Sequence, residues 1–214
     1  GNNSLTTITN GLVHAYDFKS LTDISNPITD LVGEYNLTLS GNPIKGTNYG
    51  GDIGGLYINN GNTKILMNGD ASKYRLTSDG SYSIIVRAKI NYKTTTALIC
   101  GGTNEATSPQ LIIWSAGNLG TYKTGTDFKD STIIQKDTTH VIGIIGDSEG
   151  LKEYIVLDGN VKSGDVTTFK GFGQINLIGY GSTGNLSTYY EMIIYNRVLS
   201  QDEITSICNE LNNL

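Results

Sequence analysis

The amino-acid sequence predicts an all-β protein, with two antiparallel sheets packed as a β-sandwich and one short helix at the C-terminal end. Charged residues make up only 16% of the 214 residues, against about a quarter in an average domain. Gly, Thr, Ile, Asn and Tyr are frequent, and short apolar runs alternate with turn signals, which is typical of strands in a sandwich. Helical periodicity occurs in one segment only, near the C-terminus.

The expected strands follow one another at short spacing along the whole chain. About a dozen short strands of this kind favour two stacked sheets. Two continuous apolar stretches, 84–86 and 142–145, are typical of central strands that are covered on both faces. The strands are expected at residues 11–18, 36–39, 53–59, 64–67, 81–90, 97–100, 111–114, 141–145, 154–157, 174–179 and 189–195.

Turn dipeptides separate many of these strands and support their boundaries. Asn-Gly and Asp-Gly are strong hairpin signals because both residue types tolerate positive φ angles. The pairs lie at Asn60-Gly61, Asn68-Gly69, Asp79-Gly80 and Asp158-Gly159. A short helical turn is also expected near 71–74.

The C-terminal helix has a clear start signal. Ser200 can cap the helix and Glu203 follows three residues later, which together form a capping box. The helix is expected over residues 201–209. Ile204, Ile207 and Leu211 recur at spacings of three and four, so one face is expected to pack on the sandwich.

The chain length suits one domain with a sizeable core. Residues 1–10 are polar and are expected to form a flexible leader or linker stub, with the domain proper at 11–214. Cys100 and Cys208 are the two cysteines. Buried free thiols are favoured for them, and a disulfide between them remains an alternative.

Charge and hydropathy exclude two classes of partner. The formal net charge is −5, and no cluster of Lys and Arg longer than a pair occurs, so the basic patch expected of a nucleic-acid-binding protein is missing. The apolar runs are much shorter than the roughly 18 residues that a membrane-spanning helix needs. Membrane insertion is therefore not expected.

The sequence offers little for catalysis. Residues 179–184 match G-x-G-x-x-G, but a strand follows where a phosphate site needs a helix N-terminus. No strand carries two carboxylates at even spacing, as a glucanase site would require. His14 and His140 are expected to be structural. No catalytic residue is assigned.

Six motifs in order resemble the laminin-G-like, or concanavalin A-like, jelly-roll domains. They include the first strand at 11–18, the turn Asp30-Leu31-Val32-Gly33, the Asp158-Gly159 hairpin and the corner Tyr195-Asn196-Arg197 before the helix. The chain departs from the family pattern at Arg87, where Trp is common. The resemblance implies a jelly-roll sandwich used mostly for recognition, and it implies a non-catalytic role.

Two groups of residues are candidates for a glycan site, because sugar binding uses exposed aromatic faces and planar polar groups in loops. The first group is Trp114, Asn118, Tyr122 and Asp127, around the loop after the strand at 111–114. The second group, in and beside the Gly-rich loop, is Tyr180, Asn185 and Tyr189.

A calcium ion is a further hypothesis from the resemblance, since some related domains bind calcium through loop carboxylates. Calcium prefers six to eight oxygen ligands. Asp30 in the Asp-x-x-Gly turn and Glu191 on the last strand are the positions that resemble such ligands. The alternatives are that Asp30 caps its turn and that Glu191 forms an ion pair.

The function predicted from these observations is carbohydrate recognition, at a cell surface or in an adhesin, outside the cell. A structural or receptor-binding module of a phage virion, such as a tail or head fibre, is the alternative, and a homo-oligomer would favour it. An accessory domain of a glycosidase is a third hypothesis.

Overall fold

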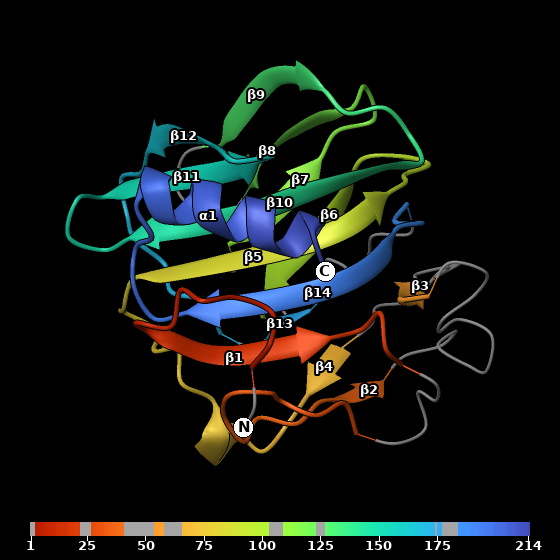
Figure 1. Ribbon diagram of the computed structural model, residues 1–214. Helices are drawn as coiled ribbons and strands as arrows, with labels where there is room; N and C mark the ends of the chain where they lie inside the picture. The colour runs from red at the N-terminus through yellow and green to blue at the C-terminus, as the bar shows by residue number, and fades with distance from the viewer. Residues whose placement is uncertain are drawn as a thin grey trace.

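The computed structural model describes residues 3–21, 27–40, 54–57, 66–102, 109–122, 127–173, 175–176 and 184–214. These residues form two seven-stranded sheets stacked face to face, with one α-helix on the outer face of the first (Figure 1). The predicted all-β sandwich with a C-terminal helix is confirmed. We call the sheet that carries the helix the front sheet and the other one the back sheet.

The front sheet has the strand order β1-β14-β5-β10-β11-β12, and β3 pairs with β14. Its neighbouring strands pair in the antiparallel direction throughout the described residues. Its strands are β1 (Leu12–Asp17), β3 (Leu56–Tyr57), β5 (Tyr82–Ile90), β10 (Thr138–Asp147), β11 (Lys152–Leu157), β12 (Asn160–Asp165) and β14 (Thr188–Tyr195).

The back sheet has the strand order β2-β4-β13-β6-β7-β8-β9, again with antiparallel pairing. Its strands are β2 (Thr38–Ser40), β4 (Leu66–Asn68), β6 (Thr96–Gly101), β7 (Gln110–Ile113), β8 (Asn118–Tyr122), β9 (Phe128–Ile133) and β13 (Ile175–Asn176). The strands expected from the sequence did not include β8, β9 and β12, because these segments mix polar, small and apolar residues without clean alternation.

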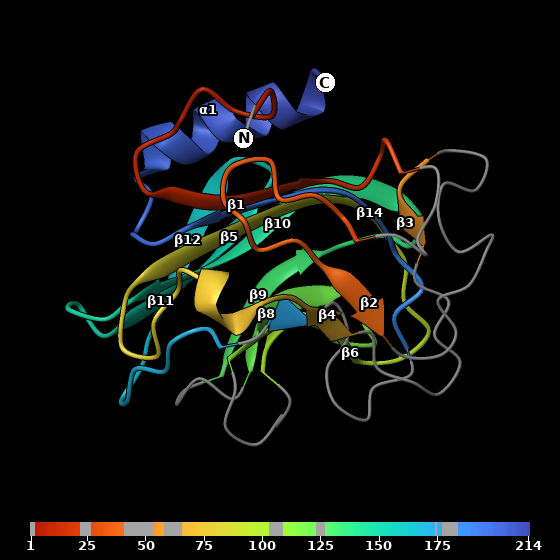
Figure 2. The same ribbon diagram turned by 90° about the horizontal axis from the view of Figure 1, so that it is seen from below.

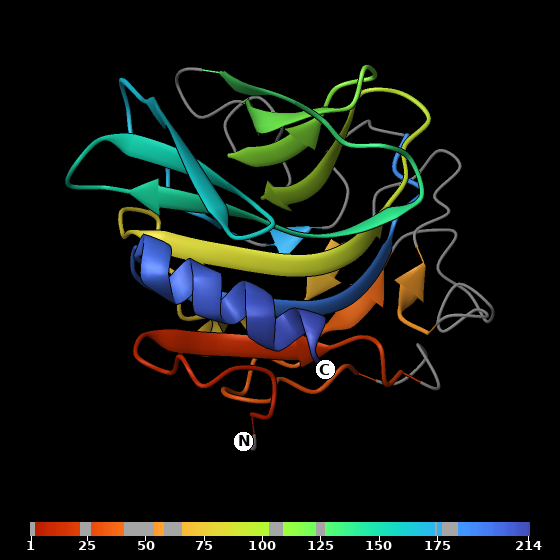
Figure 3. The same cartoon turned by 45° about the horizontal axis from the view of Figure 1, so that its top comes forward.

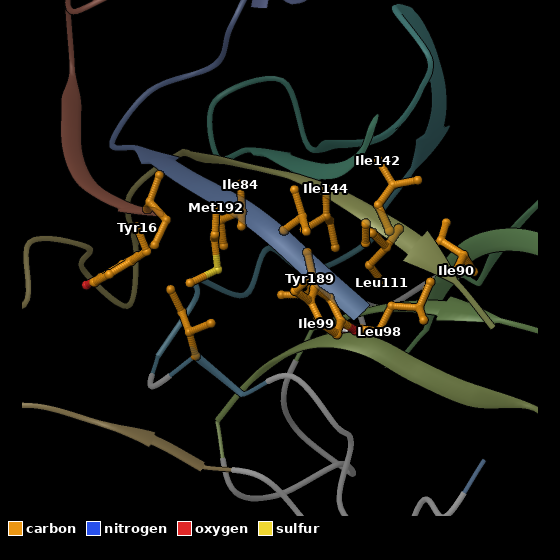
Figure 4. Close-up of a cluster of buried hydrophobic side chains, with 14 of the residues drawn as sticks. Tyr16, Ile84, Ile90, Leu98, Ile99, Leu111, Ile142, Ile144, Tyr189 and Met192 are labelled. Carbon is orange, nitrogen blue, oxygen red and sulfur yellow. Dashed lines mark hydrogen bonds between the residues drawn. The ribbon is translucent and has the colours of Figure 1, made fainter. Parts of the chain in front are cut away.

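The main core lies between the two sheets and follows from the two-residue alternation of strand side chains. In β14, Met192 and Ile194 point into this core, and Ile84 and Ile144 meet them from β5 and β10 (Figure 4). Leu111 of β7 closes the core from the back sheet. Because both sheets have an apolar inner face, each can bury it only against the other.

A second core lies on the outer face of the front sheet, beneath α1 (Gln201–Asn212), and is separate from the main core (Figure 3). The capping box between Ser200 and Glu203 is formed as predicted. Ile204, Ile207 and Leu211 are buried, which confirms the predicted apolar face of the helix. The alternate side chains of β5, β10 and β14 supply the opposite wall.

The segment 1–10, expected to be a flexible leader, contacts the domain through several of its described residues from residue 3 onward. Leu5 is buried in the second core. The hydroxyl group of Thr6 and the backbone N–H of the next residue donate to the Glu210 carboxylate of α1. The Tyr195 hydroxyl donates to a carbonyl in the same segment. Two apolar residues among polar ones, Leu5 and Ile8, are too few for a periodic signal, so sequence reasoning did not find this contact.

Local predictions can be compared with the structure at several turns. The Asp158-Gly159 pair forms the β11–β12 hairpin with both φ angles positive, at 49° and 86°. The helical turn near 71–74 is the 3-10 helix η2 (Ala71–Lys73). The Asn60-Gly61 pair lies outside the described residues. Cys100 and Cys208 are both buried and are not joined by a disulfide, as the favoured sequence prediction had it.

The helices in the described ranges include none that is long and apolar enough to cross a membrane.

Candidate functional site

The outer face of the back sheet carries the most exposed group of predicted ligand residues. Leu119 and Thr121 of β8 are completely buried, and Leu119 belongs to the main core. Alternation therefore turns Gly120 and Tyr122 to the opposite, outer face. This face lies on the far side of the sandwich from α1 (Figure 2).

Trp114 lies on this outer face and covers Gly120. A Cβ atom built on Gly120 would lie 2.5 Å from Cζ3 of the Trp114 indole and 2.0 Å from the Phe128 carbonyl oxygen. Only glycine leaves room for the ring at this point of the strand. Trp114 is half-buried, so part of the indole remains at the surface.

Lys129 of β9 is paired in register with Gly120 and completes the surroundings of the indole. Its Nζ atom lies 5.1 Å from the centroid of the Trp114 ring, within the range of a cation–π interaction. Phe128 packs against the main core, so its two neighbours, Asp127 and Lys129, share the outer face. Both of these side chains are exposed.

We call the group Trp114, Gly120, Tyr122, Asp127 and Lys129 the aromatic shelf. Tyr122 follows Gly120 on the same face, about 7 Å further along the strand at the usual rise per residue. The register of β8 and β9, continued by one residue, brings Asp127 beside it. The shelf thus offers an aromatic face, a cation, a carboxylate and a phenol on one surface.

Asn118 has a different role from the one that the sequence predicted for it. Its side-chain amide donates to the backbone carbonyl of Asp130 at 2.8 Å. The backbone carbonyl of Asn118 accepts a hydrogen bond from the backbone N–H of Trp114 at 2.9 Å. Asn118 therefore holds the β7–β8 hairpin and β9 together and so positions Trp114.

The second group of candidate ligand residues does not lie on the shelf. Tyr180 is outside the described residues. Asn185 and Tyr189 are completely buried. The Asn185 amide donates to the Tyr189 hydroxyl at 2.9 Å, and that hydroxyl donates to the Leu98 carbonyl at 2.7 Å.

The interior position of these two polar residues has a physical reason. The pairing of β6 with β7 shifts register between Ala97 and Ile99, and such a bulge removes backbone groups from the regular ladder. Buried carbonyl groups need hydrogen-bond donors. Tyr189 supplies a donor to Leu98, and Asn185 lies 3.4 Å from the Ala97 carbonyl.

Asp30 forms a buried hydrogen-bonding centre in the turn beside β1. Its carboxylate accepts from the backbone N–H groups of Ala15, Val32, Gly33 and Tyr35, at 3.0 to 3.1 Å. His14 Nδ1 donates to it at 2.7 Å, because His14 Nε2 already accepts from the Arg75 N–H at 3.1 Å. Burial acts to raise the pKa of Asp30, but the donors from His14 and the backbone outweigh it, and the pKa is lowered.

Glu191 is paired with Arg87 on the outer face of the front sheet. Arg87 donates two hydrogen bonds to its carboxylate, each at 2.7 Å, and the guanidinium group also stacks 4.5 Å from the centroid of the Tyr190 ring. Burial raises the pKa of the Glu191 carboxyl, and Arg87 offsets part of that rise. Arg87 thus fills its position on β5 as one half of an ion pair.

The two carboxylates predicted for calcium are thus engaged with protein donors. A cation at either one would have to displace hydrogen bonds that satisfy buried groups. Within the described residues, no group of three or more His, Cys, Asp or Glu side chains is placed to hold a metal ion. Calcium binding remains a prediction.

The two histidines have partners that account for them structurally. His14 stacks on Tyr74 with an interplanar angle of 6°, in addition to its bonds to Asp30 and Arg75. His140 is hydrogen bonded to Asp158 and to the Thr138 hydroxyl, and the Thr138 hydroxyl donates to a backbone carbonyl at 2.6 Å. Because that hydroxyl proton is already used, Thr138 is poorly suited to act as a nucleophile.

Sequence reasoning named three members of the shelf and missed Lys129. The apolar run Leu111-Ile112-Ile113-Trp114 hid which face Trp114 would take. A signal for Lys129 was available, because it lies two residues after Asp127 and therefore on the same face of any strand.

No protein-family model matches the chain, and no curated protein matches it. Solved structures do match. A Trypanosoma rangeli sialidase in complex with sialic acid has a TM-score of 0.66 and 13% identity, over 94% of this chain and 33% of that one. A mutant of that sialidase that displays trans-sialidase activity has a TM-score of 0.67 and 14% identity, over 95% and 34%.

The binding domain of botulinum neurotoxin serotype G also matches, with a TM-score of 0.63 and 14% identity over 92% of this chain and 50% of that one. At these identities the likeness establishes the fold alone. The chain spans about a third of the length of the sialidases that it matches.

Proposed function

We propose that this protein is a non-catalytic recognition domain that binds glycans outside the cell, and that the aromatic shelf is its binding surface. The observation that carries the proposal is the half-buried indole of Trp114, which lies against Gly120 on the outer face of the back sheet and keeps part of its surface accessible. Aromatic faces of this kind stack on the apolar faces of sugar rings, while neighbouring polar groups orient the hydroxyls.

The chemistry around the indole supports this proposal. Asp127 can accept hydrogen bonds from sugar hydroxyls, and Lys129 can donate them. Both side chains are exposed. Rigid strands hold Trp114 and Tyr122, so little conformational freedom is lost when a ligand binds.

The comparisons support the proposal at the level of architecture. One matching structure is described as a binding domain, and another is a sialidase in complex with sialic acid. In both, the matching part is a fraction of a longer chain, which favours a module that contributes binding. The order of the six motifs supports membership of the laminin-G-like group, which is part of the same proposal.

The distribution of carboxylates favours a non-catalytic role. Glycoside hydrolysis by the usual mechanism uses two carboxyl groups on either side of the scissile bond. Asp127 is the one carboxylate of the shelf as we define it from the described residues. The nearby Asp130 carboxylate is held by Lys162 Nζ, at 2.9 Å from each oxygen.

The test is a glycan array with the purified domain and its Trp114→Ala variant. We expect the wild type to bind a restricted class of glycans, and the variant to lose about tenfold or more in affinity, because a stacking contact of about 1 kcal/mol and its buried area are removed. Trp114→Phe should keep part of the affinity.

Leu151→Ala is the matched control, because Leu151 is another exposed apolar side chain, 44% accessible, at the β10–β11 turn of the front sheet. Circular dichroism should show that all variants are folded. If the Trp114→Ala variant binds glycans with the affinity of the wild type, the binding site lies elsewhere on the protein. A folded wild type that binds no glycan would contradict the proposed function. A parallel array with excess chelator tests the calcium prediction.

A further inference from the structure

The charge at the centre of the shelf suggests which glycans it prefers. Three lysines in the described part of the chain form ion pairs with carboxylates: Lys73 with Glu34, Lys152 with Asp165, and Lys162 with Asp130. Lys129 is one of the lysines without an ion pair in the described part of the chain, and its Nζ atom lies beside the indole of Trp114. It is a cation held beside an aromatic surface.

A second lysine in the molecule has almost the same local geometry and a different setting. Lys136 Nζ lies 5.2 Å from the centroid of the Tyr92 ring. Tyr92 is only 4% exposed, and its hydroxyl donates to the Ile134 carbonyl. Lys136 therefore covers a buried ring that no ligand can reach, whereas Lys129 stands beside a ring that remains at the surface.

A ligand that reaches the Trp114 indole also comes within reach of the Lys129 ammonium group, whose flexible stem lets it follow a ligand. A charge-assisted hydrogen bond to a carboxylate is about twice as strong as a neutral one. Asp127 lies two residues from Lys129 on the same face and is positioned to accept from hydroxyls. The shelf thus places a cation and a hydrogen-bond acceptor next to each other, beside the aromatic surface of β8 and Trp114.

We infer that the aromatic shelf selects saccharides that carry a carboxylate, with the sugar ring on Trp114 and the carboxylate on Lys129. This inference rests on the proposed function and specifies its ligand class. The net charge of −5 opposes the approach of dense polyanions. An acidic sugar with one carboxylate at the shelf fits better than a highly sulfated chain.

The experiment compares acidic glycans with neutral partners of the same shape. The probes are a galacturonate tetramer and its carboxyl-reduced form, sialyllactose and lactose, and heparin as a dense polyanion, measured by calorimetry on the full chain. We expect about tenfold tighter binding of at least one carboxylated probe than of its neutral partner, the size of one charge-assisted hydrogen bond at a partly exposed site. Added salt should reduce this preference.

Two substitutions assign the preference to Lys129. Lys129→Met should abolish it, so that the acidic probe and its neutral partner bind with affinities that agree within about twofold, since the stacking surface remains and the charge is lost. Lys129→Arg should restore it, because arginine keeps the charge. Lys136→Met is the matched control and should change neither affinity.

The outcomes separate the inference from the function on which it rests. Equal binding of acidic and neutral partners, a preference that survives Lys129→Met, or heparin as the preferred probe would overturn the inference and leave glycan binding in place. Absence of binding to any of these probes and to the array would overturn both.

Discussion

The two outer faces of the sandwich differ in how far they are covered. The front sheet is covered by α1 and by the segment from residue 3, and the side chains between them are apolar and buried (Figure 3). The back sheet lies on the far side of the sandwich from α1 (Figure 2). Its outer face presents Trp114 and Tyr122 half-buried, with Lys129 exposed. The same strand alternation produces an additional core on one face and a surface for recognition on the other.

This difference implies that substitutions on the two faces should have separable effects. On the front sheet, the outward residues contribute to the free energy of unfolding, because burial removes their apolar area from water. On the back sheet, the outward side chains of Trp114 and Tyr122 are only partly buried, and that of Lys129 is exposed. They should contribute less to stability and more to ligand affinity.

The largest expected effect is on the covered face. Ile207→Ala removes a fully buried side chain between α1 and the front sheet, and should lower the free energy of unfolding by about 2–4 kcal/mol. Urea denaturation measures the loss. Glycan affinity at the shelf should be unchanged in the folded protein.

Ser206→Ala is the control for this substitution, since Ser206 is exposed on the same helix and should change stability by less than about 0.5 kcal/mol. Equal effects of the two substitutions would show that the helix does not stabilise the sandwich as its burial implies.

An intermediate effect is expected at the one shelf position that is packed tightly. Gly120→Ala adds a methyl group that would meet the Phe128 carbonyl oxygen and the Trp114 ring at 2.0 and 2.5 Å. Relief requires movement of backbone or indole, and such overpacking costs about 1–3 kcal/mol. Thermal unfolding measures the cost, and tryptophan fluorescence should report the displaced ring, since Trp114 is the one Trp of the sequence.

Gly173→Ala is the matched control, because a Cβ atom there meets nothing nearer than a carbonyl oxygen at 3.8 Å. A Gly120→Ala variant with unchanged stability and fluorescence would contradict the described contact between the indole and the strand.

The smallest expected effect is a pH-dependent one at the start of α1. Hydrogen bonds from Arg197 to Glu203, with those in the capping box, lower the pKa of Glu203 to about 2. A carboxyl group with a lowered folded-state pKa stabilises the fold above its unfolded value, about 4.3, and this stabilisation is lost as the pH falls through that range towards 2.

Glu203→Gln should therefore lower stability by about 1–2 kcal/mol at pH 7, a figure reduced for solvent screening of a partly exposed pair. The difference from wild type should shrink as the pH falls from about 4.5 to about 2. Unfolding curves across that range measure it, and Glu149→Gln, at an exposed turn residue, should show no such trend. A difference in the free energy of unfolding between wild type and Glu203→Gln that stays constant at all pH values would show that the charge of Glu203 does not stabilise the fold.

The fold was predictable because its signals are local. Turn dipeptides such as Asp158-Gly159 require positive φ angles that few residues tolerate, and the box of Ser200 and Glu203 marks a helix start wherever it occurs. Neither signal depends on distant partners. The structure confirms both.

The site was only partly predictable because strand register and bulges determine which side chains reach the surface. Trp114 follows three apolar residues, so its face depends on pairing with β8. Tyr189 resembles a surface ligand residue in sequence, but the β6 bulge gives it a buried carbonyl to satisfy. Such long-range demands cannot be found from the local pattern.

The packed N-terminal segment has a practical consequence. Leu5 and Thr6 lie against α1, so both ends of the described chain emerge on the helix side of the sandwich (Figure 2). Attaching copies to a bead or sensor through either terminus should leave every Trp114 facing the solution. Weak individual sites displayed at high density in one orientation would then combine through avidity.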